Sequence, residues 1–303
     1  MLFFTEICII KKWKISEWGL VEMHIHEQSW TATYKETYLN GSSAFNKNHL
    51  HTNMHQLIYV VEGECNVCVS DKMYHAGPKT LIVFNNIERH WVRVLTKPYK
   101  RYVVDISGDF LRSLQLGKEM MSLFNCRTNE FRSCMDISDM DTRVRGYLDR
   151  LVEEDKKQAE MEYTSDVAAC VLKLLLIELF RTKRPYFPDT HHLLYTEIYP
   201  VKQYLDKHYA ENITMEQLSE LFHISKSGLT QKFRDLTGDS PKHYLMLYRL
   251  AVAKSLLYST ELSVSEVAEQ TGFGDVNNFI RYFKNDTGVT PLHYRKVIMN
   301  QTD

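Results

Sequence analysis

The last third of the chain repeats itself after fifty residues, and this repeat limits the possible folds more than any other feature of the sequence. Residues 233–244 and 283–294 share Phe, Thr, Gly, Pro, His and Tyr in one register. Upstream in the same register, Ser225 matches Asp275, and both residue types are common N-caps of helices. Such agreement is improbable by chance, so we expect two copies of one structural unit.

Each copy is expected to form two helices that meet at a sharp turn. In the first copy, residues 215–222 form a short helix with Leu218 and Leu221 on its apolar side. Ser225 then caps a second helix that ends at Gly238, a residue type that readily adopts the left-handed conformation found after helix ends. The second copy has an equivalent apolar stripe and an equivalent capped helix, made by Val264, Val267 and Ala268 and by residues 275–288. This pattern predicts two helix-turn-helix units.

The second helix of each copy has an apolar face and a largely polar face. Leu229 with Phe233, and Phe279 with Phe283, have the i, i+4 spacing of inward residues. The opposite faces carry the candidate DNA-contacting residues Ser227, Thr230, Gln231, Arg234, Asn277, Ile280, Arg281 and Lys284. Amide, hydroxyl and guanidinium groups can read hydrogen-bond patterns in a major groove, and an arginine such as Arg281 can make two bonds to guanine. The exception is Ile280, which either touches a thymine methyl or has no role in contact.

Turn, cap and core residues of the second copy together resemble the AraC/XylS family of transcription regulators. These residues are Ala268, Gly272, Phe273, Asp275, Phe279, Phe283, Lys284, Gly288, Pro291, Tyr294 and Arg295. The resemblance extends over residues 194–296. It implies an all-α domain in which a long helix, 241–257, joins two units whose recognition helices enter successive major grooves of double-stranded DNA, about 34 Å apart. RNA polymerase is a further candidate partner.

The charge of the chain does not by itself indicate a nucleic-acid-binding protein. The formal net charge is −1, and residues 194–303 contain 12 Lys and Arg against 13 Asp and Glu. Because non-specific affinity for DNA comes mainly from cations beside phosphates, we expect that affinity to be modest. Dimerisation or contacts that depend on DNA bending would then be needed for tight binding.

Residues 24–107 contain short β-branched and aromatic runs separated by turn residues, which predicts many short strands in a sandwich or barrel. The residues that resemble the two cupin motifs are His49, His51, Gln56, Gly63 and His90. Gln56 replaces the usual glutamate of the first motif, and Lys79 stands where the second motif begins with glycine. The resemblance implies a cupin-like β-barrel in front of the DNA-binding domain.

Three interpretations of the polar residues in these motifs stay open. They bind an organic effector without metal, they bind a divalent metal through three imidazoles and one oxygen, or they have no binding role. We take His49, His51, Gln56 and His90 as candidate effector-binding residues and expect no metal and no cofactor. For the whole chain, the alternatives to an effector-controlled regulator are a metal-dependent cupin enzyme fused to a DNA-binding module and a regulator that responds to no ligand.

Helical periodicity replaces the strand pattern between the two zones. We expect helices at about 140–158 and from Ser165, as N-cap, to Arg181, and these resemble the dimerisation segment of such regulators. The apolar residues Val167, Val171, Leu174, Leu175 and Leu179 either form a seam between two protomers or pack against the barrel. The predicted fold is therefore α+β and multidomain, with an effector domain at 24–135, a helical dimerisation segment at 136–183, a linker at 184–193 and the DNA-binding domain at 194–303.

The sequence also bears on where the chain resides. No apolar run reaches the roughly 18–20 residues needed to cross a bilayer, and no basic segment precedes the apolar N-terminus. The six cysteines are scattered, and the pair Cys65 and Cys68 would point to opposite faces of a strand. We therefore expect a cytoplasmic, non-membrane homodimer whose chain starts at Met1 or Met23.

Overall fold

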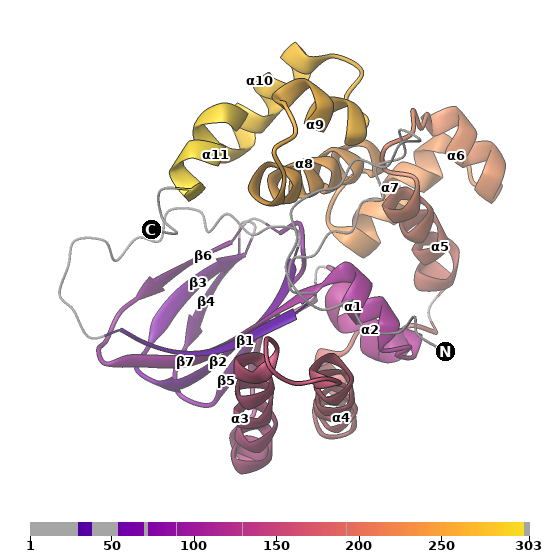
Figure 1. Cartoon of the computed structure of the whole chain (residues 1–303). Helices are drawn as coiled ribbons and strands as arrows, with labels where there is room; N and C mark the ends of the chain where they lie inside the picture. The colour runs from indigo at the N-terminus through magenta and orange to yellow at the C-terminus, as the bar shows by residue number, and fades with distance from the viewer. Residues whose placement is uncertain are drawn as a thin grey trace, which may run out of the picture.

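The N-terminal half of the chain is built on two antiparallel sheets that face each other (Figure 1). The computed structural model describes residues 30–37, 54–69, 72–88, 90–128, 130–191 and 193–299. A five-stranded sheet has the order β1-β7-β2-β5-β8, and a three-stranded sheet has the order β4-β3-β6. The strands are β1 (Trp30–Thr37), β2 (Met54–Glu62), β3 (Cys65–Val69), β4 (Lys72–Ala76), β5 (Thr80–Phe84), β6 (His90–Val94), β7 (Tyr99–Ser107) and β8 (Cys134–Asp136).

Strand β2 shows how the larger sheet contributes to two cores. Ile58 and Val60 lie in a core between the two sheets, which we call the inner core. Leu57 and Tyr59 lie in a second core, the outer core, between the larger sheet and the helices that cover it. Gln56 has the same parity as Ile58, so its side chain projects from the inner-core face of the sheet.

Lys79 keeps the backbone conformation of the glycine that it replaces in the second cupin motif. Its φ is 67°, in the left-handed region that glycine adopts at little cost. The Lys79 N–H donates to the carbonyl of Val60 at 2.8 Å, and its carbonyl accepts from the N–H of Ile137 at 3.0 Å. These two bonds fix the turn before β5. Lys79 therefore adopts a backbone conformation typical of glycine, although its side chain differs from the motif.

The N-terminal half also contains helices α1 to α4, of which α3 packs against β1 of the larger sheet and α4 packs against α3 and α2 (Figure 1). They are α1 (Gly108–Ser113), α2 (Lys118–Asn125), α3 (Asp141–Lys157) and α4 (Thr164–Thr182). The prediction that Ser165 caps α4 is wrong, because the N-cap is Tyr163 with φ of 61°. Ser165 lies inside the helix, and its Oγ accepts a hydrogen bond from Nε1 of Trp30, 135 positions away.

Helix α4 divides the five apolar residues of the predicted seam between the core and the surface. Leu175 and Leu179 are fully buried in the outer core, and Val171 packs partly against it. Val167 is half-buried, and Leu174 is 50% exposed. Packing within one chain therefore accounts for Leu175 and Leu179, and it leaves Leu174 without a buried role.

The proline-containing segment after α4 is folded against the N-terminal half. Phe187 is buried in the outer core, and its ring meets the ring of Phe180 edge-on at 5.2 Å. The Arg184 guanidinium donates to the Phe187 carbonyl at 3.0 Å. The first residues of the predicted linker, 184–187, are thus packed on the N-terminal half.

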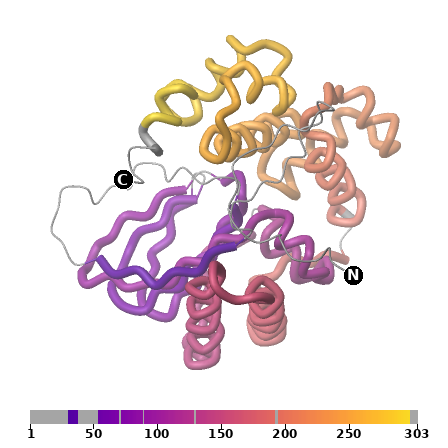
Figure 2. Tube along the Cα trace, viewed as in Figure 1, coloured from indigo at the N-terminus to yellow at the C-terminus, as the bar shows by residue number. Residues whose placement is uncertain are grey.

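The C-terminal part consists of helices, shown from orange to yellow above the sheets in Figure 2. They are α5 (Leu193–Lys207), α6 (Met215–Phe222), α7 (Lys226–Thr237), α8 (Pro241–Ser259), α9 (Val264–Gln270), α10 (Val276–Thr287) and α11 (Pro291–Met299). Two helix pairs, α6 with α7 and α9 with α10, correspond to the two copies of the repeat. The expected α+β architecture, with a β-rich N-terminal domain and an all-α C-terminal domain, is confirmed.

The caps of the two repeat helices are those that the sequence predicts. Ser225 accepts from the N–H of Gly228 at 3.2 Å, and Asp275 accepts from the N–H of Asn277 at 2.9 Å. The helices end at Gly238 and Gly288, whose φ values are 86° and 81°. The four inward residues Leu229, Phe233, Phe279 and Phe283 are fully buried.

Leu221 is not on the buried side of α6, contrary to expectation. Leu218 is buried, whereas Leu221 is 52% exposed and Phe222 packs partly against the core instead. Because a helix has 3.6 residues per turn, the residues three and four positions after Leu218 flank its direction on opposite sides. The core of this domain lies on the side of Phe222. Among the described helices, none has the length and apolar character needed to cross a membrane.

Candidate nucleic-acid interface and ligand site

Helix α7 presents three of its four predicted contact residues to solvent. Ser227, Gln231 and Arg234 are exposed. Thr230 is half-buried, and its hydroxyl donates to the carbonyl of Lys226 at 2.8 Å. The Thr230 hydroxyl hydrogen is therefore already bound within the helix.

Helix α10 is similar, with one difference. Asn277, Arg281 and Lys284 are exposed. Ile280 is half-buried and packs against the core of the C-terminal domain. Part of the Ile280 side chain thus has a packing role, which explains an apolar residue at the edge of a polar face.

Neighbouring side chains on the same helix hold two of the candidate contact residues. Arg281 donates through Nη2 to Oδ1 of Asn278 at 2.9 Å, and its guanidinium lies 5.3 Å from the centre of the Tyr282 ring. On α7, Nε2 of Gln231 donates to Oδ1 of Asp235 at 2.9 Å. Such contacts reduce the rotamer freedom that a side chain loses on binding. The i, i+3 spacing of Asn278 and Arg281 is visible in the sequence, although Asn278 was not among the predicted residues.

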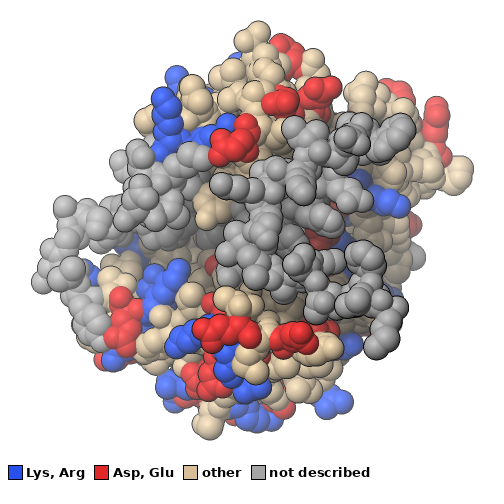
Figure 3. Space-filling view, viewed as in Figure 1, with Lys and Arg blue, Asp and Glu red and all other residues tan. Residues whose placement is uncertain are grey.

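Acidic partners reduce the positive charge near the first recognition helix. Lys226 pairs with Glu216 of α6, and Nζ of Lys232 lies 2.5 Å from a carboxylate oxygen of Glu197 of α5. On the face shown in Figure 3, acidic and basic side chains are intermingled over the C-terminal helices, with no extended basic patch among the described residues. The described side chains on this face are therefore mixed in charge, in keeping with the composition of the domain.

A glycine at the turn of the second unit fits closely against the first unit. Gly272 has φ of 77°, and a Cβ there would lie 2.6 Å from the carbonyl oxygen of Ala210. Ala210 lies in the connection between α5 and α6. The turn before α10 is thus placed by direct backbone contact with the chain that leads into the first unit.

Two arginines bind backbone carbonyls at or just after the C-terminal ends of α5 and α8. Arg249 of α8 donates to the carbonyls of Tyr209 and Glu211 at 2.6 and 2.7 Å. Arg295 of α11 donates to the carbonyls of Leu257 and Leu262 at 3.0 and 2.6 Å. Both bind carbonyls near a helix C-terminus, where the last carbonyls lack helical partners. Each arginine therefore helps to fix a helix-turn-helix unit to the long helix α8.

In the N-terminal half, Gln56 belongs to a polar group on the inner-core face of the larger sheet. Its Nε2 donates to Oδ1 of Asp105 at 2.6 Å, and the hydroxyl of Thr31 donates to Oδ2 of Asp105 at 3.4 Å. Burial raises the pKa of the Asp105 carboxyl, against the lowering effects of Gln56, Lys35 and Thr31. Sequence reasoning missed Asp105. The feature that could have indicated it is its position two residues after the buried Val103, which places a carboxylate on the inward face of the same strand.

His90 belongs to β6 of the smaller sheet and faces the inner core from the opposite side, next to Phe84. The two rings are stacked with centroids 3.7 Å apart, and His90 Nδ1 donates to the carbonyl of Glu88 at 3.0 Å. Phe84 pairs in register with Gln56, so the side chains of Gln56 and His90 flank the same phenylalanine. The other two candidate effector residues, His49 and His51, lie outside the described residues. Within the part of the chain that is described, no group of three or more His, Cys, Asp or Glu side chains is arranged to hold a metal ion.

Two protein families match the two parts of the chain. The family described as an AraC-like ligand binding domain matches residues 40–162. The family described as a helix-turn-helix domain matches residues 218–297. The first match covers most of the two sheets and extends through α3, and the second covers both copies of the repeat.

Curated proteins with similar sequences are named as helix-turn-helix (HTH) transcriptional regulators. One from Staphylococcus aureus (strain MSSA476), the uncharacterized HTH-type transcriptional regulator SAS0078, is 29% identical over 153 residues. That match covers 50% of this chain but only 20% of the relative, so the chain spans a fifth of the relative's length. The uncharacterized HTH-type transcriptional regulator YdiP of Escherichia coli (strain K12) is 25% identical over 256 residues, which are 83% of this chain and 82% of YdiP.

A solved structure has a similar fold over most of the chain. It is unsaturated fatty acid bound wild-type ToxT from Vibrio cholerae strain SCE256, with a TM-score of 0.56. The superposition covers 89% of this chain and 95% of the ToxT chain, at 15% sequence identity. At this identity the similarity is one of fold.

Proposed function

Because this chain belongs to the AraC/XylS family of helix-turn-helix transcription regulators, we propose that α7 and α10 enter successive major grooves of one DNA duplex. The observation that supports this most is the repeated pair of capped helices, each with a buried apolar face and an exposed polar face. The contact residues in this proposal are Ser227, Thr230, Gln231, Arg234, Asn277, Ile280, Arg281 and Lys284. The DNA-binding domain spans 194–303 and follows a linker at 184–193.

A small molecule in the N-terminal domain, residues 24–135, would modulate this binding. Gln56 and Asp105 of the larger sheet and His90 of the smaller sheet place an amide, a carboxylate and an imidazole toward the inner core, which supports a polar effector site there. His49 and His51 are retained as candidate members of that site. The fatty acid in the ToxT structure belongs to ToxT, and it gives no identity for the effector of this chain.

The DNA-binding proposal is tested by selecting duplexes from a random-sequence library with the purified full-length chain. We expect enrichment of two short conserved blocks whose centres lie about 10 base pairs apart, because the two recognition helices would face successive grooves. Footprinting of an enriched duplex then measures the protected length. Failure to enrich any sequence, at low salt as well as at physiological salt, would contradict the proposal.

The helical segment 136–183 is proposed to form a homodimer through the outer face of α4. Along this face lie residues at helical spacing that are apolar and at least partly exposed, namely Val167, Cys170, Leu174 and Ile177. They form a stripe, which we call the α4 stripe, on the side of the helix opposite Leu175. A stripe of this kind is buried when two helices pack together.

Replacement of Leu174 by Glu is expected to weaken the dimer at least tenfold, because it puts a charge in the centre of the α4 stripe. Analytical ultracentrifugation over a range of protein concentrations measures the dissociation constant. Met73→Glu is the matched control, since Met73 is a similarly exposed apolar residue (54%, against 50% for Leu174) on β4, away from α4. Equal loss of dimer in both variants, or a monomeric unaltered chain, would refute the α4 interface.

The remaining expectations belong to the same proposal. The relatives that cover this chain are named as regulators and not as enzymes, which supports a binding role without catalysis. A regulator of this class would act in the cytoplasm, where its DNA is. RNA polymerase is the protein partner we propose for the DNA-bound form.

A further inference from the structure

The N-terminal half contributes residues to the core of the DNA-binding domain. Cys126, just after α2, is fully buried in the C-terminal core, and Ile87, between β5 and β6, packs against it. The backbone N–H of Arg127 donates to the carbonyl of Leu236 at 2.7 Å. Leu236 lies in the last turn of α7, where carbonyls lack helical partners. The connection after α2 therefore completes the C-terminal end of the first recognition helix.

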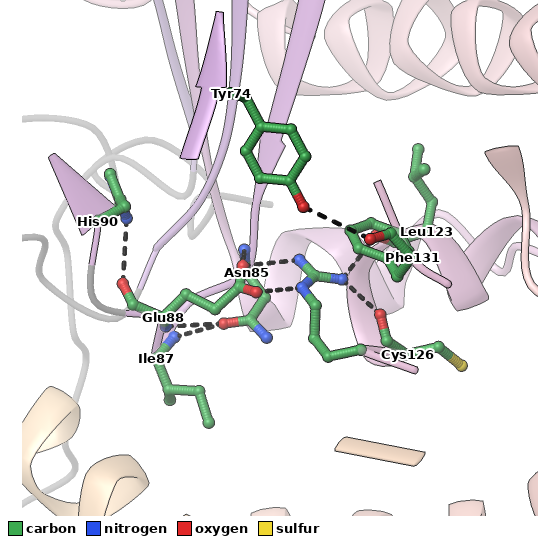
Figure 4. Close-up of polar contacts among 9 residues, drawn as sticks. Tyr74, Asn85, Ile87, Glu88, His90, Leu123, Cys126 and Phe131 are labelled. Carbon is green, nitrogen blue, oxygen red and sulfur yellow. Dashed lines mark hydrogen bonds and ion pairs between the residues drawn. The ribbon is translucent and has the colours of Figure 1, made fainter. Parts of the chain in front are cut away.

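The side chain of Arg127 links this connection to the turn between β5 and β6. Its guanidinium binds the Glu88 carboxylate with two hydrogen bonds, one through Nε and one of 2.8 Å through Nη2 (Figure 4). Nη1 donates to the carbonyls of Leu123 and Cys126 at 3.1 and 2.7 Å. The side chains of Arg127 and Glu88 are only 9% and 8% exposed. Each nitrogen of the guanidinium thus has a partner in a buried site.

Glu88 is held in turn by the residues around it. The Asn85 side chain accepts from the N–H groups of Ile87 and Glu88 at 2.9 and 2.8 Å, and Glu88 accepts from the N–H of Asn85 at 2.8 Å. The Glu88 carbonyl accepts from Nδ1 of His90 (Figure 4). The His90 ring is stacked on the ring of Phe84. Both ends of the turn 85–88 are therefore anchored to residues of the inner core.

We propose that the turn 85–88 and Arg127 form a latch that couples the position of His90 in the N-terminal domain to the orientation of helix α7. A shift of His90 moves Glu88, because Nδ1 of His90 donates to the carbonyl of Glu88 at 3.0 Å. A buried charged pair has no favourable half-open state, since separating the charges leaves each one unpaired in a poorly polarisable environment. Arg127 therefore has two alternatives. It moves with Glu88 and displaces the end of α7 through its bond to Leu236, or its ion pair with Glu88 breaks.

The latch rests on the proposed function in one respect, because α7 is taken as a recognition helix. It goes beyond that function by naming the route from the inner core to the DNA-contacting surface. Its two effects are separable: the change in α7 can be measured without DNA, and the change in affinity is measured with DNA.

The test is a double-mutant cycle in the full-length chain. His90→Ala, Glu88→Gln and Arg127→Lys are each made alone, and His90→Ala is also combined with each of the other two. Glu88→Gln keeps the shape of the side chain and removes its charge, and Arg127→Lys keeps the charge and loses the two-bond geometry. The probe is a duplex enriched from a random-sequence library by the unaltered chain. Hydrogen exchange is followed in peptides that cover residues 123–131 and 230–240.

We expect His90→Ala to change the affinity for this duplex about fivefold or more, the lower range of coupling between distinct sites. In the Glu88→Gln or Arg127→Lys background, the same substitution should change affinity less than about twofold, because residues of one network act non-additively. Hydrogen exchange in 230–240 should rise in all of these variants. Val92→Ala, on the same strand and the same face, is the control for general loosening of the inner core and should leave 230–240 unchanged.

Additive effects of His90→Ala in both backgrounds would overturn the latch, as would unchanged exchange in 230–240. A raised exchange rate in the Val92→Ala variant equal to that of His90→Ala would also overturn it, because loosening alone would then suffice. If the unaltered chain enriches no duplex, the proposed function fails, and the exchange measurements still decide whether the latch exists. If one of the double variants does not fold, the other completes the cycle.

Discussion

Gly272→Ala lowers the free energy of unfolding by about 2–5 kcal/mol, the sum expected for a left-handed alanine and an overpacked contact. A Cβ at this position would lie 2.6, 2.8 and 2.9 Å from the carbonyl oxygen, carbonyl carbon and Cα of Ala210. These are backbone atoms, so no rotation of a side chain can relieve the clash. Denaturation in urea, followed by circular dichroism, measures the change in stability.

The same substitution should also abolish specific DNA binding. Because Gly272 and Ala210 place the turn before α10 against the first unit, a displacement there changes the spacing between α7 and α10. Gly274→Ala is the matched control: a Cβ at Gly274 would meet no atom within 4 Å, and the φ of Gly274 is not positive. We expect it to change stability by less than about 0.5 kcal/mol. A Gly272→Ala protein of normal stability would show that the contact with Ala210 can relax.

Local signals made the C-terminal half predictable. Ser225 and Asp275 accept bonds from amides within three residues, and Gly238 and Gly288 end their helices through their own backbone conformation. Each of these interactions lies within one turn of helix, so the sequence around it contains all the information. Where the outcome depended on the direction of a distant core, as for Leu221, the same reasoning gave the wrong side.

The candidate ligand site and the contact between the halves depend on residues that are far apart in the sequence. Gln56 and Asp105 are 49 positions apart, and Arg127 and Glu88 are 39 positions apart. Gln56 could be singled out because it falls in a motif, whereas its partner Asp105 has no motif of its own. Strand register brings such pairs together, and register is set by the whole sheet. Neither pair could therefore be predicted from the residues around it.

Arg281→Ala should weaken binding to the preferred duplex by about 1–3 kcal/mol, or about 5- to 150-fold, and relax the sequence preference at one base pair. Arg281 is exposed on α10 and is held by Asn278 and by the ring of Tyr282, so its guanidinium is partly ordered before DNA binds. Binding is measured by fluorescence anisotropy on a set of duplexes that differ at single positions. As the control, Arg181→Ala removes the same charge from an exposed arginine at the end of α4, in the other half of the chain.

The pattern of losses across the duplex set distinguishes the two ways in which Arg281 can contact DNA. A base contact predicts a large loss on the preferred sequence and a small one on duplexes that already lack the matching base. A phosphate contact predicts equal losses on every duplex and a smaller dependence of affinity on salt. Because this domain carries 12 basic against 13 acidic side chains, the total salt dependence of binding should be shallow, and the first pattern is the one we expect. Equal losses on all duplexes would mean that Arg281 contacts the phosphate backbone. Base contacts by α10 would then have to come from its neighbours on that helix.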